Sequence, residues 1–268
     1  MCIIFLWRGV SRSNYKFILA ANRDEYFSRP AKPASFWEGN DSHILAGQDL
    51  TEGYEGGTWL GITRSGRVCF LTNISTNEVI SSAQKGRGQL VADFLRSEIN
   101  PSDYLLGLEK IKKTFRPFNL VAGLIESDFI YISTENNLCA LEKGYLCLTN
   151  SSLDKPCLKA LNSLNKFKDL FNSEEEIENI HEKLFTLLAD KTKNTDLCQE
   201  SSDEWNSSIY IDPTTAPFDN ANVFGTRTST VITVDINNHV VFQEKTKTDA
   251  NQQLSDWLSS TYEYDIIK

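Results

Sequence analysis

The order of apolar runs along the chain is the feature that most constrains its fold. Short apolar or alternating runs, which are typical of strands, come in groups, and runs with helical spacing separate the groups. The runs that predict strands span 2–7, 16–21, 58–63, 67–72, 118–125, 129–133, 145–149, 226–235 and 240–245. The runs that predict helices span 88–97, 102–113, 155–170 and 173–189. Because sheets and amphipathic helices bury their apolar faces against each other, this order predicts an α+β fold: a four-layer αββα sandwich with helices outside two stacked sheets.

The composition limits the number of domains and the kinds of partner. The chain has 268 residues, of which 40% are hydrophobic, so it is long enough to bury a large core. We expect one domain that spans 1–268. The net charge is −9, and the sequence lacks the basic patch that a nucleic-acid surface needs. Nucleic acid is therefore excluded as a partner.

The cysteines and the apolar start bear on metal binding and location. The six cysteines form no CxxC pair, and their spacing with the three histidines does not resemble a zinc site. Most lie in apolar runs, where a free thiol acts as a small hydrophobic group, which indicates a reducing compartment. The apolar start, 2–7, is far shorter than the roughly 18 residues of a membrane span and too short for a signal peptide. We expect no metal site, no transmembrane segment and a location in the cytoplasm or an organelle interior.

The start Met-Cys suggests a nucleophile at the amino terminus. Cysteine is small enough for Met1 to be removed, which leaves Cys2 with both a thiol and a free α-amine. The reference pKa of that amine, about 7.7–8.0, lies close to the thiol value of about 8.5, so the amine can take the thiol proton. The alternative is a partly buried cysteine at the start of a strand.

A polar cluster, Asn22, Arg23, Asp24 and Glu25, directly follows the predicted strand 16–21. Four polar residues in this position normally form a turn. If the strand pairs with the first one, however, its end returns close to the amino terminus. Arg23 could then stabilise a thiolate and Asp24 could hold the α-ammonium, while Asn22 and Glu25 would contact a ligand.

Arg227 and Trp59 are further candidates. Arg227 interrupts a run of β-formers, and strict alternation puts it on the face of Ser229 and Val231. An inward-facing arginine needs a partner or an anionic ligand. Trp59 follows a glycine turn and could wall a pocket for an apolar ligand, although a tryptophan of the core is the alternative.

Seven motifs, in a fixed order over nearly the whole chain, resemble those of the NRDE family of transport and Golgi organisation proteins. They are MCIIF, ILAANRDEYFSRP, EGGTWLGIT, GRVCFLTN, GRGQLV, FNLVAGL and FGTRTSTVITVD. The resemblance implies the fold of the N-terminal nucleophile hydrolases. It also implies roles in haem mobilisation, Golgi and endoplasmic reticulum organisation, and mitochondrial lipid or acyl-coenzyme A homeostasis.

That family in turn resembles the cholylglycine hydrolase and penicillin V acylase group, which cleave amides with an N-terminal cysteine. The matching positions are Cys2, Arg23, Asp24, Asn73, Asn150 and Arg227. The resemblance implies that Asn73 and Asn150 form the oxyanion hole and that Arg227 supports the nucleophile. The alternative for each asparagine is a turn former at the end of a strand.

Two functions remain open at this point. In one, the chain carries a small apolar or acyl ligand, or haem as cargo, and has no required cofactor; Cys2 is then the best thiolate ligand for haem iron. In the other, Cys2 hydrolyses an amide or an acyl thioester. The expected location is cytoplasmic, with possible transient association with mitochondrial, Golgi or endoplasmic reticulum membranes, and the sequence leaves the oligomeric state open.

Overall fold

The computed structural model describes residues 2–9, 14–76, 84–171, 179–193, 207–216, 219–253 and 256–267. The chain divides into two compact units. Unit 1 comprises Met1–Arg29, Lys143–Thr149 and Pro156–Tyr264, and unit 2 comprises Pro30–Glu142, Asn150–Lys155 and Asp265–Lys268. Among the helices of the described residues, none is long and apolar enough to cross a membrane.

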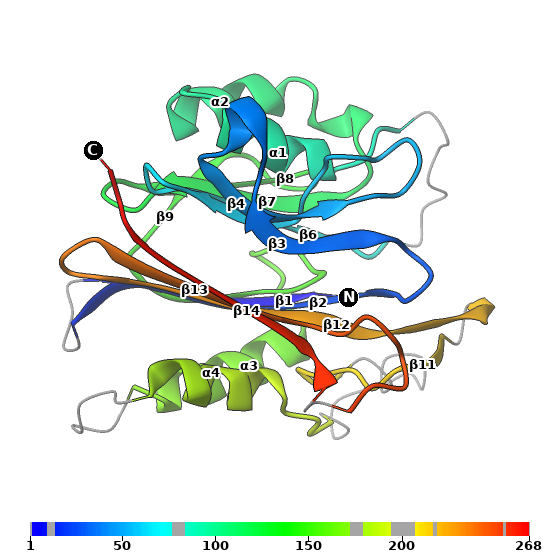
Figure 1. Cartoon of the computed structure of the whole chain (residues 1–268). Coiled ribbons are helices and arrows are strands. Elements are labelled where there is room, and N and C mark those ends of the chain that lie inside the picture. Colours follow the sequence, from blue (N-terminus) through cyan, green and yellow to red (C-terminus); the bar gives the residue numbers. More distant parts are fainter. Residues whose placement is uncertain are drawn as a thin grey trace. The chain divides into compact units, whose positions relative to one another are not determined.

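Unit 1 is built on a sheet with the strand order β10-β1-β2-β12-β13-β14, and β11 pairs with β12. The strands are β1 (Ile3–Arg8), β2 (Tyr15–Tyr26), β10 (Gly144–Leu148), β11 (Thr214–Ala216), β12 (Asp219–Asp235), β13 (His239–Thr246) and β14 (Leu258–Asp265). Helices α3 (Leu158–Asp169) and α4 (Ile180–Leu188) lie along one face of this sheet (Figure 1). Phe5 and Ile18 of the sheet pack there against Phe167 and Leu184 of the helices. Alternate residues of β1 and β2 therefore point toward the helices.

Unit 2 is built on a second antiparallel sheet, in the order β3-β4-β5-β6-β7-β8-β9. The strands are β3 (Ala31–Phe36), β4 (Ile44–Asp49), β5 (Leu60–Thr63), β6 (Arg67–Asn73), β7 (Phe118–Leu124), β8 (Phe129–Ser133) and β9 (Cys139–Leu141). Helices α1 (Gly88–Arg96) and α2 (Pro101–Glu109) cover one face of it (Figure 1), and short 3-10 turns lie at Gly39–Asp41 and Lys112–Thr114. Phe94 and Leu105 of the helices share a core with Leu120 and Ile132 of the sheet.

Most of the predicted elements are confirmed. Short polar or glycine turns between strand runs predict three hairpins: 2–7 with 16–21, 58–63 with 67–72, and 226–235 with 240–245. All three form, as β1–β2, β5–β6 and β12–β13, and Gly66 takes a φ of 78° in the second, as a glycine turn requires. Strands β3, β4, β9, β11 and β14 were missed, because their short or polar sequences carry no clear alternation. The sequence also predicts a capping box at the start of the helix 173–189, with Ser173 as the cap and Glu176 three residues later. Both lie outside the described residues.

His181 fixes α4 to the sheet. The sequence places His181 on the helix predicted over 173–189 and predicts that it faces solvent. This is wrong, because its ring nitrogens lie 3.0 Å from Gln243 Oε1 and 2.8 Å from Thr233 Oγ1. Burial lowers the pKa of His181 below its ordinary value, so the ring is neutral at pH 7. Protonation would place a charge in this contact between helix and sheet.

A pH titration of stability tests this contact. Because the pKa of His181 is lower in the folded than in the unfolded chain, the unfolded chain binds more protons as the pH falls. The contribution of neutral His181 is fully present above its ordinary pKa of 6.5 and declines as the pH drops toward the lowered value. In urea denaturation between pH 5 and 7.5, His181→Gln should show a smaller loss of stability at low pH than the wild type. His43→Gln is the control for losing a histidine elsewhere, and equal pH dependence in wild type and His181→Gln would contradict the prediction.

Two glycines of unit 2 give a second test. A Cβ on Gly88, the first residue of α1, would lie 3.2 Å from Gly57 Cα and 3.2 Å from Thr58 N, in a contact held by the hydrogen bond from Thr58 N–H to Gly88 O. Gly88→Ala should therefore lower the free energy of unfolding by about 1–3 kcal/mol through overpacking. Gly107 of α2 has open space around its Cβ position, so Gly107→Ala should raise it by about 0.5–1 kcal/mol. Urea denaturation measures both, and a stabilised Gly88→Ala would contradict the argument.

Candidate active site

The polar cluster Asn22–Glu25 lies inside β2, not in a turn after it, because β2 continues to Tyr26. The antiparallel register sets Ile3 opposite Asn22, and the next pair in this register is Cys2 and Arg23. On its other side β2 pairs with β12. The predicted return of the second strand to the amino terminus is confirmed, and the pairing brings Cys2 beside Arg23.

The thiol of Cys2 lies in a mixed environment. Burial is the largest influence and raises the pKa of Cys2, and the negative charge of Asp24 acts in the same direction. The positive charge of the amino terminus, a hydrogen bond from the Asp24 backbone N–H and the charge of Arg23 lower it. Burial prevails, so Cys2 is held as a neutral thiol beside three groups that favour the thiolate.

Asp24 is fixed by a chain of buried hydrogen bonds. Its side chain is 4% exposed, and Thr226 Oγ1 donates to Asp24 Oδ1 at 2.6 Å. The same hydroxyl accepts from Ile211 N at 2.8 Å. A carboxylate with a buried hydroxyl donor has a set orientation, and the Thr226 hydroxyl can keep only one rotamer while it serves both partners.

Asn22 joins β2 to the segments beside it. Its Nδ2 donates to Leu188 O at 2.8 Å and to Ile209 O at 3.0 Å, and its Oδ1 accepts from Ser229 Oγ at 2.7 Å. The side chain is 1% exposed. These bonds occupy both amide hydrogens. A ligand-binding role for Asn22 stays a prediction, and it would be indirect, through the residues that Asn22 holds in place.

Arg227 lies where the alternation of β12 breaks. The register shifts between Thr226, which pairs with Asp24, and Thr228, which pairs with Arg23, so Arg227 is the extra residue of a bulge. The prediction that it shares the face of Ser229 and Val231 is wrong, because a bulge changes the phase of all residues before it. Its charge acts on the side of Arg23 and Glu25 instead.

An arginine cluster surrounds Glu25 on this side of β2. Arg23 Nη2 and Arg29 Nε lie 3.6 Å and 3.8 Å from Glu25 Oε2. Arg227 Nη1 donates to Tyr26 O at 2.8 Å and to Arg29 O at 2.6 Å. Burial, together with the charge of Arg23, lowers the pKa of Arg227 to about 10. Arg227 Nε is buried and meets no acceptor among the described residues, which is rare for a buried donor.

Asn73, Asn150 and Trp59 belong to unit 2, and their functional roles stay predictions. Asn150 Nδ2 donates to Asn73 O at 2.7 Å, so the structure brings these two residues together, and the Asn73 side chain is exposed. Trp59 is half-buried and packs over Gly47, where a Cβ would lie 2.7 Å from its ring.

Sequence reasoning missed a buried network beside Asn150. Asn119 is fully buried, and its Nδ2 donates to Thr72 Oγ1 at 3.0 Å and to Ser151 O at 2.9 Å. Tyr131 donates to Asn119 Oδ1 at 2.7 Å and accepts from Leu153 N at 3.1 Å. An asparagine inside an apolar strand is the signal that could have revealed it. The network holds the loop that carries Asn150.

The placement of histidines, cysteines, aspartates and glutamates bears on metal binding. Within the described residues, no group of three or more histidines, cysteines, aspartates and glutamates is placed to hold an ion. Among the described residues, Cys2, Cys69, Cys139, Cys147 and Cys157 form no disulfide.

Comparison with known proteins identifies the family. Residues 1–249 match the family model described as Transport and Golgi organisation 2. The chain belongs to this family. It is 35% identical over 280 residues to the human Transport and Golgi organization protein 2 homolog, covering 99% of each chain. It is 28% identical over 290 residues to Transport and Golgi organization protein 2 of Drosophila melanogaster, again covering 99% of each.

Two solved structures with the same fold carry the names of hydrolases. A mutant conjugated bile acid hydrolase from Clostridium perfringens matches with a TM-score of 0.52 at 11% identity, covering 99% of this chain and 97% of that one. A Caenorhabditis elegans ortholog of N-acylethanolamine-hydrolyzing acid amidase matches with a TM-score of 0.51 at 12% identity, covering 87% and 92%. The predicted α+β fold of the N-terminal nucleophile hydrolase type is thereby confirmed. At such identities the likeness concerns the fold and does not extend to the activity.

The hydroxyl of Thr226 gives a test of the site's construction. Thr226→Val removes the donor to the Asp24 carboxylate and the acceptor of Ile211 N–H, and leaves both groups buried. The free energy of unfolding should fall by about 1.5–3 kcal/mol, the range for hydrogen bonds to charged groups. Thr226→Ser keeps the hydroxyl and should stay closer to the wild type. Urea denaturation measures both, and equal stability of the valine variant and the wild type would contradict the role assigned to the hydroxyl.

Proposed function

We propose that this chain handles acyl thioesters, such as acyl-coenzyme A, at a site of the N-terminal nucleophile hydrolase type in which Cys2 is the reacting group. The observation that carries the proposal is the β1–β2 register, which sets Cys2 opposite Arg23 with the Asp24 N–H bonded to the sulfur. A positive charge and a backbone donor both favour the thiolate, which is the reactive form of cysteine. The biological role that follows is acyl-lipid homeostasis.

The proposed reaction begins once Met1 has been removed. The α-amine of Cys2 takes the thiol proton, and Sγ attacks the carbonyl carbon of the thioester. The bond between this carbon and the coenzyme A sulfur breaks, and coenzyme A leaves as a thiol after taking up the proton. Cys2 then holds the acyl group as a thioester. Attack by water would release the fatty acid and restore the Cys2 thiol, and this second step distinguishes a hydrolase from an acyl carrier.

The charges around Cys2 support an anionic ligand. Arg23 and Arg29 both contact Glu25, and the charges of Arg23 and Glu25 act on Arg227, so three arginines gather on this side of β2. Arg227 Nε adds a buried donor that meets no acceptor among the described residues. Arginine is well suited to phosphate and carboxylate groups, and coenzyme A carries phosphates.

Binding and transfer of haem is the second candidate function. Burial raises the pKa of Cys2 and so lowers its reactivity toward a carbonyl, whereas iron that binds the sulfur displaces the thiol proton itself. A cysteine thiolate is an established ligand type for haem iron. Haem is cargo in this proposal and not a required cofactor. Either function is expected in the cytoplasm, with transient association with mitochondrial, Golgi or endoplasmic reticulum membranes.

Intact-mass spectrometry tests the first function. Tag-free protein with its native start is mixed with palmitoyl-coenzyme A, and the mass is followed with time. We expect loss of Met1 and a gain of one acyl group that is absent in Cys2→Ala and retained in Cys157→Ala, which removes an exposed thiol.

The other outcomes separate the two functions. Retained Met1, or no adduct while the thioester still binds, contradicts the nucleophile and favours the carrier. In that case haem titration should give a Soret band that shifts in Cys2→Ala. An adduct that persists in Cys2→Ala would show that a different side chain reacts.

A further inference from the structure

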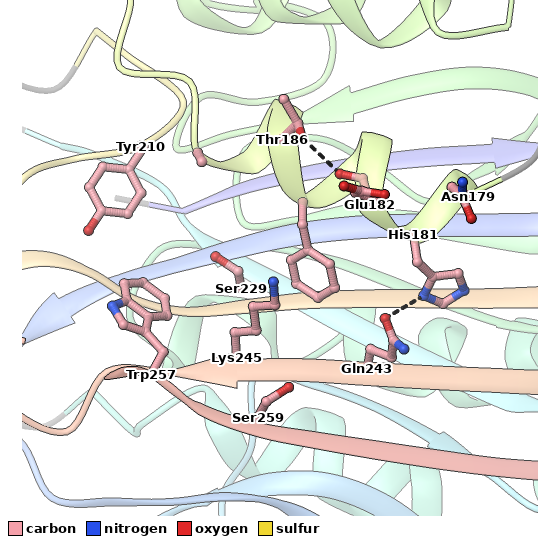
Figure 2. Close-up of a pocket in the computed structure, with 12 residues that line it drawn as sticks. Asn179, His181, Glu182, Thr186, Tyr210, Ser229, Gln243, Lys245, Trp257 and Ser259 are labelled. Atoms are coloured by element: carbon pink, nitrogen blue, oxygen red, sulfur yellow. Dashed lines mark hydrogen bonds between the residues drawn. The ribbon is translucent and has the colours of Figure 1, made fainter. Parts of the chain in front are cut away.

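A pocket opens on the helix-covered face of unit 1, between α4 and strands β12, β13 and β14 (Figure 2). Its volume is about 720 Å³, within the range of roughly 300–1,000 Å³ that is usual for small-molecule sites. Every lining residue belongs to unit 1 and to the described part of the chain. The pocket is thus a feature of one compact unit.

Three aromatic side chains from three different segments form its apolar wall. Phe185 comes from α4, Tyr210 precedes β11 and Trp257 precedes β14. The rings of Tyr210 and Trp257 are 6.1 Å apart and tilted by 36°. These two side chains are 3% and 8% exposed, so the surface they offer is held in a fixed position. Rigid aromatic surface binds an apolar body at low cost in conformational entropy.

Lys245 places a positive charge beside this wall. It lies on β13 opposite Ser229 of β12, and its Nζ is 4.3 Å from the centre of the Phe185 ring. Within the described residues, no carboxylate lies within 4.0 Å of this ammonium. Lys245 is exposed at the pocket, so its charge is available to a ligand.

The rest of the lining is polar but brings little opposing charge. His181 and Gln243 are hydrogen-bonded to each other and appear together in Figure 2. Ser229 donates its hydrogen to Asn22, and Glu182, the one acidic side chain among the described lining residues, is exposed to solvent. An anion bound at Lys245 would therefore keep most of the attraction of that lysine.

We propose that this pocket binds an amphiphilic monoanion, with an apolar or aromatic body against Phe185, Tyr210 and Trp257 and its single carboxylate or sulfonate on Lys245. A single lysine acts as a point charge, which matches one anionic group and does not demand the two-pronged geometry of an arginine site. The proposal concerns a second site and does not depend on the function proposed for Cys2. Ile3 and Phe5 pack toward the helices, so Cys2 follows the opposite phase of β1.

The fluorescent probe 1-anilinonaphthalene-8-sulfonate has the proposed chemistry, a ring system with one sulfonate. Its binding to the full chain is measured by fluorescence titration, beside N-phenyl-1-naphthylamine, which has the ring system without the charge. Lys245→Glu should weaken binding of the sulfonate at least tenfold and leave the neutral probe largely unchanged. Lys143→Glu makes the same charge change at an exposed lysine outside the pocket and should leave both affinities within about twofold. Dodecanoate should displace the sulfonate at lower concentration than dodecanol.

A second variant tests whether the probes bind in this pocket, by filling part of its volume. Thr186 is exposed on α4 and lines the pocket, so Thr186→Trp should fill space and weaken both probes. Near-UV circular dichroism checks that each variant remains folded. Unchanged sulfonate binding in Lys245→Glu, or equal losses in Lys143→Glu and Lys245→Glu, would overturn the proposal. Cys2→Ala should bind both probes as the wild type does, so the result is independent of whether Cys2 is acylated.

Discussion

The pairing of β2 with two antiparallel neighbours is the constraint on which the rest of unit 1 depends. Its register with β1 sets Cys2 opposite Arg23, and its register with β12 sets Asp24 opposite Thr226. A shift of one residue in either ladder would move every side chain to the other face of the sheet. The hydrogen bond from Thr226 to Asp24 and those of Asn22 to Leu188 and Ile209 hold this register with side chains as well as with the backbone.

Burial and charge act against each other around Cys2. Burial disfavours the thiolate and raises the pKa of Cys2, while Arg23 and the Asp24 N–H favour the charged form. At Arg227, burial and the charge of Arg23 act together and lower the pKa, and only the charge of Glu25 opposes them. A bound anion would shift the pKa values of Cys2 and Arg227, because its negative charge stabilises the charged form of the arginines while the ligand displaces water. This is the physical basis for expecting ligand binding near Cys2 to change the reactivity of its thiol.

The period of two along a strand separates the two proposed sites of unit 1. Asn22 and Asp24 of β2 point to the same side as Ile18, which packs on the helices, and Ser229 of the Lys245 pocket bonds to Asn22. Arg23 and Glu25 alternate with them and belong to the other face. One strand therefore supplies neighbouring residues to two chemically different surfaces, and Asn22 connects the pocket wall to the strand that carries Arg23.

The sequence by itself determined the local features: the β1–β2, β5–β6 and β12–β13 hairpins, the helices with clear apolar faces, and the family through its ordered motifs. The sequence also predicted that Arg23 lies beside Cys2, because a hairpin register depends on residues close together in the chain. Only the tertiary structure decided the phase of Arg227, since the bulge in β12 arises from pairing with a strand about 200 residues earlier. The same holds for the partners of His181, for the buried Asn119 network and for the Lys245 pocket. Each depends on contacts between distant segments, and local periodicity carries no information about such contacts.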